Sequence, residues 1–156
     1  MPLLSLFSNN FPDHFIVERA GVADIAKIET DRDREDATFE WTGPNLSPGA
    51  TGQLRRGSAP LGFVLMIATF DGNRLHGKFF DGIVDPEVKA QVRADSTFII
   101  EKGVIDPNQV SFRSVQFPDL FIRHRDFMLF GEPVRFPPEL QSATFRIAAP
   151  LNADNQ

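Results

Sequence analysis

The feature that most constrains the fold is a phrase of fifteen residues that occurs twice. SLFSNNFPDHFIVER begins at Ser5 and SFRSVQFPDLFIRHR begins at Ser111, and eight of the fifteen positions are identical. A second marker follows each copy, DATF at 36–39 and SATF at 142–145. Two markers that recur in the same order are not explained by chance, and such repeats predict an architecture of equivalent units.

A third and weaker copy lies between these two. The marker recurs as DSTF at 95–98, and QLRRGSAPLGFVLM at 53–66 keeps a Leu, an Arg, a Pro and a Phe in register with the opening phrase. The predicted units run from about 5 to 52, 53 to 110 and 111 to 151. Together they form one domain, 1–156, with a short flexible C-terminal tail. The middle unit is longer than the others, and we expect its extra residues, 71–89, in a surface loop.

The segments between the markers favour short strands over helices. Twelve Pro and eleven Gly are spread along the chain, and short apolar runs alternate with turn sequences such as PD and DG. Only 86–94 is expected to make a helical turn or two, and the charged run DRDRED at 31–36 is interpreted as a solvated loop. One four-stranded unit cannot bury its apolar face alone, whereas three around a pseudo-threefold axis close a barrel. The predicted fold class is therefore all-β, a β-trefoil of three pseudo-symmetric repeats with Phe39, Phe98 and Phe145 at equivalent core positions.

Composition limits the partners. The formal net charge is −5, whereas nucleic acids and anionic membranes both favour clustered Lys and Arg, so we expect neither as a partner. The chain has no Cys, and its three His residues lack metal-site spacing, so we expect no metal and no cofactor. The first residues do not resemble a signal peptide, which fits a cytoplasmic protein or a secreted one whose signal has been removed. A closed trefoil rarely needs a second subunit to fold, so a monomer is expected.

The repeated motifs resemble those of the arabinofuranose-binding (AbfB-type) domain, a β-trefoil carbohydrate-binding module attached to α-L-arabinofuranosidases. The family's opening phrase is roughly S-x-R-S-x-N-x-P-D-x-x-I-R-H and its closing marker is D-A-[ST]-F, to which 111–125 and 36–39 are similar. The resemblance covers residues 5 to about 151. It implies non-catalytic binding of an arabinose-containing polysaccharide or oligosaccharide, because catalysis in the family belongs to a separate domain. Nothing selects a catalytic pair among the 21 acidic residues, so the chain is not expected to be an enzyme.

The resemblance also implies one small pocket in each unit, formed by the His of I-R-H and the Asp of D-A-[ST]-F. A carboxylate accepts from two vicinal sugar hydroxyls, and a neutral imidazole can both donate and accept. Transferred to this chain, the pairs are Glu18 with Asp36, Met66 with Asp95, and His124 with Ser142. No unit keeps both family residues, so one or two working pockets are expected.

Each altered pair has its own consequence. In unit one the two carboxylates repel each other unless Arg19, Arg34 or a cation lies between them. In unit three, Asp126 is expected on the same strand face as His124, where its carboxylate substitutes for the missing Asp. Unit three is therefore predicted to be the best remaining pocket.

Other interpretations stay open. The alternative for His124 is a surface position between two arginines, and for the Asp residues a role as turn caps. The alternative function is a degenerate trefoil that has lost sugar binding and recognises a protein partner through its loops. That function predicts an apolar surface patch near the insertion, formed by Phe70, Phe79, Phe80, Ile83 and Val84.

Overall fold

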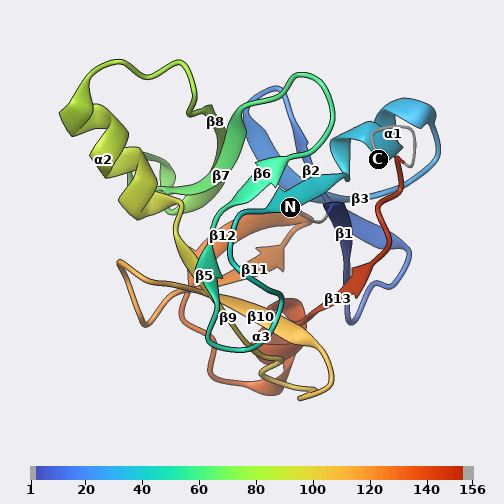
Figure 1. Ribbon diagram of the computed structural model, residues 1–156. Helices are drawn as coiled ribbons and strands as arrows, with labels where there is room; N and C mark the ends of the chain where they lie inside the picture. The colour runs from blue at the N-terminus through green and yellow to red at the C-terminus, as the bar shows by residue number, and fades with distance from the viewer. Residues whose placement is uncertain (1–2, 153–156) are drawn as a thin grey trace.

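The computed structural model describes residues 3–152, in which one order of elements occurs three times (Figure 1). Unit one contains β1 (Leu3–Ser8), β2 (His14–Arg19), β3 (Val22–Lys27), α1 (Asp31–Asp36) and β4 (Phe39–Trp41). Unit two follows the short strand β5 (Thr51–Gly52) and contains β6 (Leu54–Arg56), β7 (Phe63–Ala68), the 3₁₀ turn η1 (Thr69–Asp71), β8 (Arg74–Phe79), α2 (Pro86–Asp95) and β9 (Phe98–Lys102). Unit three contains β10 (Val110–Ser114), β11 (Phe121–Arg125), β12 (Met128–Glu132), α3 (Pro137–Ser142) and β13 (Phe145–Ala148).

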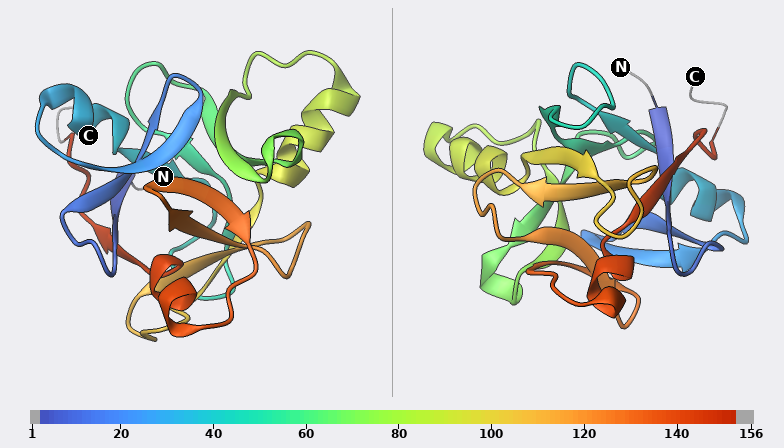
Figure 2. Two further views of the ribbon diagram at one scale, coloured as in Figure 1. Left: turned by 180° about the vertical axis from the view of Figure 1, so that it is seen from behind. Right: turned by 90° about the horizontal axis from the view of Figure 1, so that it is seen from below.

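Backbone pairing joins the three units into a closed ring. The first strand of each unit pairs antiparallel with the last strand of the preceding unit: β6 with β4, β10 with β9, and β1 with β13. The register repeats as well, since the opposed pairs are Phe39–Arg56, Phe98–Ser114 and Phe145–Ser8. Figure 2 shows the blue, green and orange units in separate sectors around a common centre. The architecture is a β-trefoil, as the repeats predict.

The repeated markers hold this ring together. Phe39, Phe98 and Phe145 are wholly buried in one hydrophobic cluster, at equivalent positions as predicted. The Thr before each Phe donates its hydroxyl to the carbonyl four residues back, at 2.6–2.8 Å. The opening hydroxyls of Ser5 and Ser111 donate to the carbonyls of the Ala residues two positions before Phe39 and Phe145, at 2.6 and 2.7 Å. Most of what repeats in the sequence therefore serves the fold rather than a ligand.

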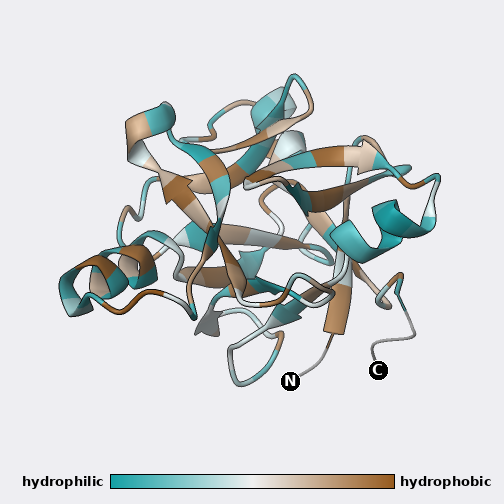
Figure 3. Ribbon diagram, turned by 90° about the horizontal axis from the view of Figure 1, so that it is seen from above, coloured by the Kyte–Doolittle hydropathy of each residue, from teal (hydrophilic) through white to brown (hydrophobic). Residues whose placement is uncertain are grey.

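The prediction of a solvated loop at 31–36 is wrong, because these residues form α1. The Thr30 hydroxyl accepts from the Asp33 N–H at 3.1 Å, and the Asp33 carboxylate accepts from the Thr30 N–H at 3.0 Å. Such a reciprocal cap starts a helix without help from an apolar face. Figure 3 shows α1 as almost entirely hydrophilic, and its one buried residue is Asp36. Helix α3 was also not expected, whereas α2 extends the turn predicted at 86–94.

The surface loop predicted at 71–89 is also wrong, since β8 and the start of α2 lie within it. Phe80 is buried, and Ile83 packs against the same small interior cluster, whose other members are Val64, Met66, Ala68 and Val92. The predicted apolar patch is therefore not one surface. Its exposed members include Phe70, which precedes β8, and Phe79, which ends it.

The two ends of the described chain lie close together. The backbone N–H groups of Leu151 and Asn152 donate to the hydroxyls of Ser5 and Thr38, both at 3.1 Å. The predicted flexible tail otherwise falls on 153–156, outside the described residues. Within 3–152, none of the helices is long and apolar enough to cross a membrane.

Candidate functional site

Three equivalent sites lie where the second strand of a unit, the end of its helix and the first strand of the next unit meet. We call them sites one, two and three. Site one combines Glu18 of β2, Asp36 of α1 and Arg56 of β6. The counterparts at site two are Ile67, Asp95 and Ser114, and those at site three are His124, Ser142 and Ser8. All nine side chains belong to buried residues.

The assignment of Met66 to site two is wrong by one residue. The connection between β6 and β7 is one residue longer than its counterparts, because Arg55 pairs with Val64 whereas Phe7 pairs with Phe15. The strand partners that define the equivalent position are Glu18–Ala23, Ile67–Leu75 and His124–Leu129. Met66 instead faces the cluster beneath α2. Site two therefore has an apolar side chain, Ile67, where the family has His.

Site one is held together by the guanidinium of Arg56. Its Nη1 donates to the Glu18 carbonyl at 2.6 Å and to Glu18 Oε1 at 3.3 Å, and its Nη2 donates to Asp36 Oδ1 at 2.7 Å. The two other bonds run to the backbone carbonyls of Ser58 and Ala59, each at 3.0 Å. Five N–H groups thus meet five acceptors, which is the full capacity of an Arg side chain. Arg56 separates the two carboxylates and has no donor left for a ligand.

The outer face of site one is open and carries charged side chains at its rim. Arg19 Nε donates to Asp36 Oδ2 at 3.1 Å, as the sequence suggested, whereas Arg34 pairs with Asp31 instead. Exposed Arg32 also approaches Asp36. A cavity of about 440 Å³ opens here, lined by Glu18, Arg19, Ala20, Gly21, Arg32, Arg56, Pro60 and Phe63. Within residues 3–152, the guanidinium groups of Arg19 and Arg32 still have N–H donors without a hydrogen-bond partner at this surface.

A two-residue hairpin shapes one wall of that cavity. Ala20 and Gly21 connect β2 to β3 with positive φ angles of 56° and 85°, the conformation of a type I′ turn. The Gly21 N–H then donates to Glu18 Oε2 at 3.1 Å. Across the strands, Gly77 leaves room for Glu18, because a Cβ there would lie 2.5 Å from the carboxylate oxygen.

Site two has the apolar side chain of Ile67 at the position that Glu18 and His124 occupy in the other two sites. Burial raises the pKa of the Asp95 carboxyl, whose side-chain partner is the amide of Gln91, at 3.0 Å. Ile67 belongs to the main hydrophobic core, close enough to Gly131 that a Cβ there would lie 2.6 Å from it. The site offers little to a sugar hydroxyl.

Site three is closed by residues of unit one. His124 is 4% exposed, so its interpretation as a surface residue is wrong. Its Nε2 lies 2.9 Å from the Ser8 hydroxyl and 3.0 Å from Asn10 Oδ1, which assigns the proton to Nε2 because the amide oxygen only accepts. The ring of Phe11 covers the imidazole edge-on at 5.6 Å. The Ser142 hydroxyl bonds within α3, to the Glu139 carbonyl at 2.7 Å.

The expected position of Asp126 is wrong. Strand β11 ends at Arg125, and Asp126 and Phe127 form a two-residue turn with positive φ angles of 53° and 63°. Asp126 is exposed, and it lines a different cavity with residues of β3. Its carboxylate therefore does not substitute for the Asp missing from site three.

His124 makes the stability of the fold depend on pH. Burial lowers its pKa from 6.5 to about 4, with smaller effects of Arg123 and His14. Between these values the unfolded chain binds a proton that the native chain excludes, so the free energy of unfolding falls as pH falls from 6.5 toward 4. We expect a loss of roughly 3 kcal/mol over this range. Urea denaturation at pH 7, 5.5 and 4 measures it, and His124→Asn should flatten the dependence; equal slopes for the two proteins would contradict the assignment.

Several residues at these sites were missed by sequence reasoning. Arg56 and Ser8 belong to the unit after the one whose site they complete, so the motifs of that site's own unit do not mark them. Their one signal is position four of the opening phrase, which faces the closing Phe of the preceding unit in the strand register. The cover of Phe11 over His124 also joins two units.

The fold and its three equivalent sites define the chain as a β-trefoil module. A protein-family model described as the Alpha-L-arabinofuranosidase B (ABFB) domain matches residues 69–155, and the chain belongs to this family. No curated protein matches the chain.

Solved structures agree on the fold. A GH54 α-L-arabinofuranosidase soaked with a cyclic sulfate inhibitor has a TM-score of 0.71 and 15% identity, with 96% of this chain and 31% of that chain covered. An arabinofuranosidase complexed with arabinofuranosyl-α-1,2-xylobiose has a TM-score of 0.70 and 16% identity, with 97% and 32% covered. The BEL β-trefoil has a TM-score of 0.66 and 12% identity, with 94% and 92% covered. The chain thus spans about a third of the two arabinofuranosidases and nearly all of the trefoil.

Proposed function

We propose that this chain is a non-catalytic module that binds arabinofuranosyl side chains of hemicellulose, and that site one is its working pocket. The observation that carries the proposal is the cavity of about 440 Å³ above the Glu18–Arg56 network. It combines charged groups with the apolar wall of Pro60 and Phe63, the mixture typical of small-molecule pockets. One of the similar solved structures is an arabinofuranosidase complexed with arabinofuranosyl-α-1,2-xylobiose.

The chemistry of site one suits a neutral furanose. Glu18 accepts one bond at each oxygen and retains lone pairs for sugar hydroxyls. Arg19 and Arg32 donate from the rim, and the Phe63 ring meets the C–H face of the sugar. Acids and bases balance here, because Glu18, Asp33 and Asp36 offset Arg19, Arg32 and Arg56. A single pocket of this kind binds weakly, with a Kd of about 1 mM.

Removing one rim donor tests the proposal. Arg32→Ala should weaken binding of arabinofuranosyl-xylobiose about tenfold, because a charge-assisted hydrogen bond of about 1.5 kcal/mol is lost. Arg34→Ala is the matched control, since Arg34 lies on the same helix but pairs with exposed Asp31. Calorimetric titration and affinity electrophoresis in arabinoxylan both measure the effect.

The opposite results are equally informative. If Arg32→Ala and Arg34→Ala bind arabinofuranosyl-xylobiose with equal affinity, the sugar does not bind at site one. Failure of the unmodified chain to bind arabinoxylan, arabinan or arabinofuranosyl-xylobiose would overturn the sugar-binding function and favour the trefoil that recognises a protein.

A further inference from the structure

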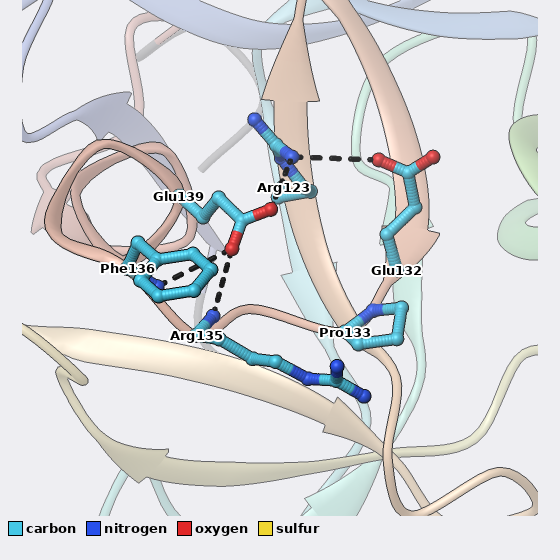
Figure 4. A pocket seen from close by; sticks show the side chains of 6 residues that line it. All are labelled: Arg123, Glu132, Pro133, Arg135, Phe136 and Glu139. Carbon is cyan, nitrogen blue, oxygen red and sulfur yellow. Dashed lines mark hydrogen bonds and ion pairs between the residues drawn. The ribbon is translucent and has the colours of Figure 1, made fainter.

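Another cavity, with charged residues in its lining, lies on unit three, between α3 and the β11–β12 hairpin (Figure 4). Its volume is about 360 Å³, and its lining residues are Arg123, Glu132, Pro133, Arg135, Phe136 and Glu139. None of these six residues forms site three. His124 and Arg123 are neighbours on β11, so their side chains point to opposite faces of the strand.

Unit two fills the same position with apolar core. The strand register makes Met66 the counterpart of Arg123, and the spacing from the end of the helix makes Val92 the counterpart of Glu139. Met66 and Val92 are buried in the cluster beneath α2. In unit three the helix has 6 residues instead of 10, and the two positions carry opposite charges. A cavity with charged lining residues therefore replaces a hydrophobic contact.

The charged groups of this cavity lie slightly too far apart to hydrogen-bond to each other. Arg123 Nη1 lies 3.6 Å from Glu132 Oε1 and 3.8 Å from Glu139 Oε2, both beyond hydrogen-bond distance. Within residues 3–152, Arg123 Nε also lacks a hydrogen-bond partner. Figure 4 shows the Arg123 guanidinium between the two carboxylates.

Other contacts keep the two carboxylates in place. Arg125 Nε donates to both oxygens of Glu132, at 3.0 and 3.1 Å. The backbone N–H groups of Arg135 and Phe136 donate to Glu139 Oε1 at 2.9 and 3.3 Å, which lowers the pKa of that carboxyl. Within the described residues, Oε2 accepts no hydrogen bond and only approaches Arg123. A hydroxyl group about 2.8 Å from Nη1 and from a carboxylate oxygen accepts from the first and donates to the second. We expect one such position between Arg123 and each of the two carboxylates.

An exposed ring completes the cavity. Phe136 is 66% exposed beside Glu139, although burial is the usual state of such a side chain. The ring offers an apolar surface next to the hydroxyl positions. Among the lining residues two Arg and two Glu balance in charge, so the lining itself does not select an anion over a neutral sugar.

We infer that this cavity is an additional sugar subsite, which binds a neutral sugar residue through two vicinal hydroxyls and stacks its C–H face on Phe136. The inference rests on the proposed function, because it assigns a second contact to the same polysaccharide. Two linked contacts raise the affinity for a polymer well above that of either alone.

Nuclear magnetic resonance titration with arabinofuranosyl-xylobiose tests the inference at residue resolution. We expect saturable shifts of the backbone amides of Glu132, Arg135 and Glu139 in addition to those of site one. Phe136→Ala should abolish the shifts at the Phe136 cavity and leave those at site one. It should also reduce affinity for arabinoxylan at least tenfold. Phe70→Ala is the control, because Phe70 is 76% exposed at η1 in unit two.

The four outcomes separate the two proposals. Shifts at both places support both, and shifts confined to site one overturn the subsite while the proposed function stands. Shifts confined to the Phe136 cavity support the subsite and overturn site one. An absence of shifts in the unmodified chain overturns both.

Discussion

Arg56→Met is expected to lower the free energy of unfolding by about 3–5 kcal/mol, because it leaves the buried carboxylates of Glu18 and Asp36 without their shared cation. Three backbone carbonyls lose their donors in the same variant. Urea denaturation at pH 7 measures the loss.

Two companion variants keep this prediction testable if Arg56→Met does not fold. Arg56→Lys retains the charge but supplies three donors in place of five, so an intermediate loss is expected. Arg34→Ala, which breaks an exposed ion pair, should be indistinguishable from the parent. A loss below 1 kcal/mol for both Arg56 variants would mean that the network does not stabilise the ring.

Phe98→Ala is expected to cost a similar amount, about 3–5 kcal/mol, through the cavity that it leaves in the core. Phe98 is wholly buried, and its backbone pairs with the first strand of unit three. Phe70→Ala removes the same atoms from an exposed position and should change stability little. Thermal and urea unfolding of the two variants give the comparison, and equal effects would place Phe98 outside the stabilising core.

The fold could be predicted from the sequence because the residues that repeat are those whose contacts close the ring. The Ser hydroxyls, the Thr hydroxyls and the three Phe rings make equivalent contacts in different units, so the pattern and the structure share one cause. Helix α1 was not predicted because no repeated or periodic pattern marks it. Its sequence DRDRED has no apolar period, and the helix depends on the Thr30 cap and on ion pairs with Arg19.

The sites followed from the sequence only in part. Glu18, Asp36, His124 and Ser142 lie at equivalent positions, but one extra residue in the β6–β7 connection moved the counterpart in unit two from Met66 to Ile67. Asp126 was misplaced because a strand was assumed to continue where a turn begins. What fills each site comes from the next unit, and such contacts depend on strand register rather than on any local motif.

The pairing of β1 with β13 has a consequence for how the chain folds. Ser8 and Phe145 meet across nearly the whole described sequence, so the chain loses much conformational entropy before this contact forms. A nascent polypeptide cannot complete the barrel until its last strand has left the ribosome. Until then the Ser5–Ser8 edge of β1 lacks its partner strand, so the interval before β13 pairs with it is the time of greatest aggregation risk.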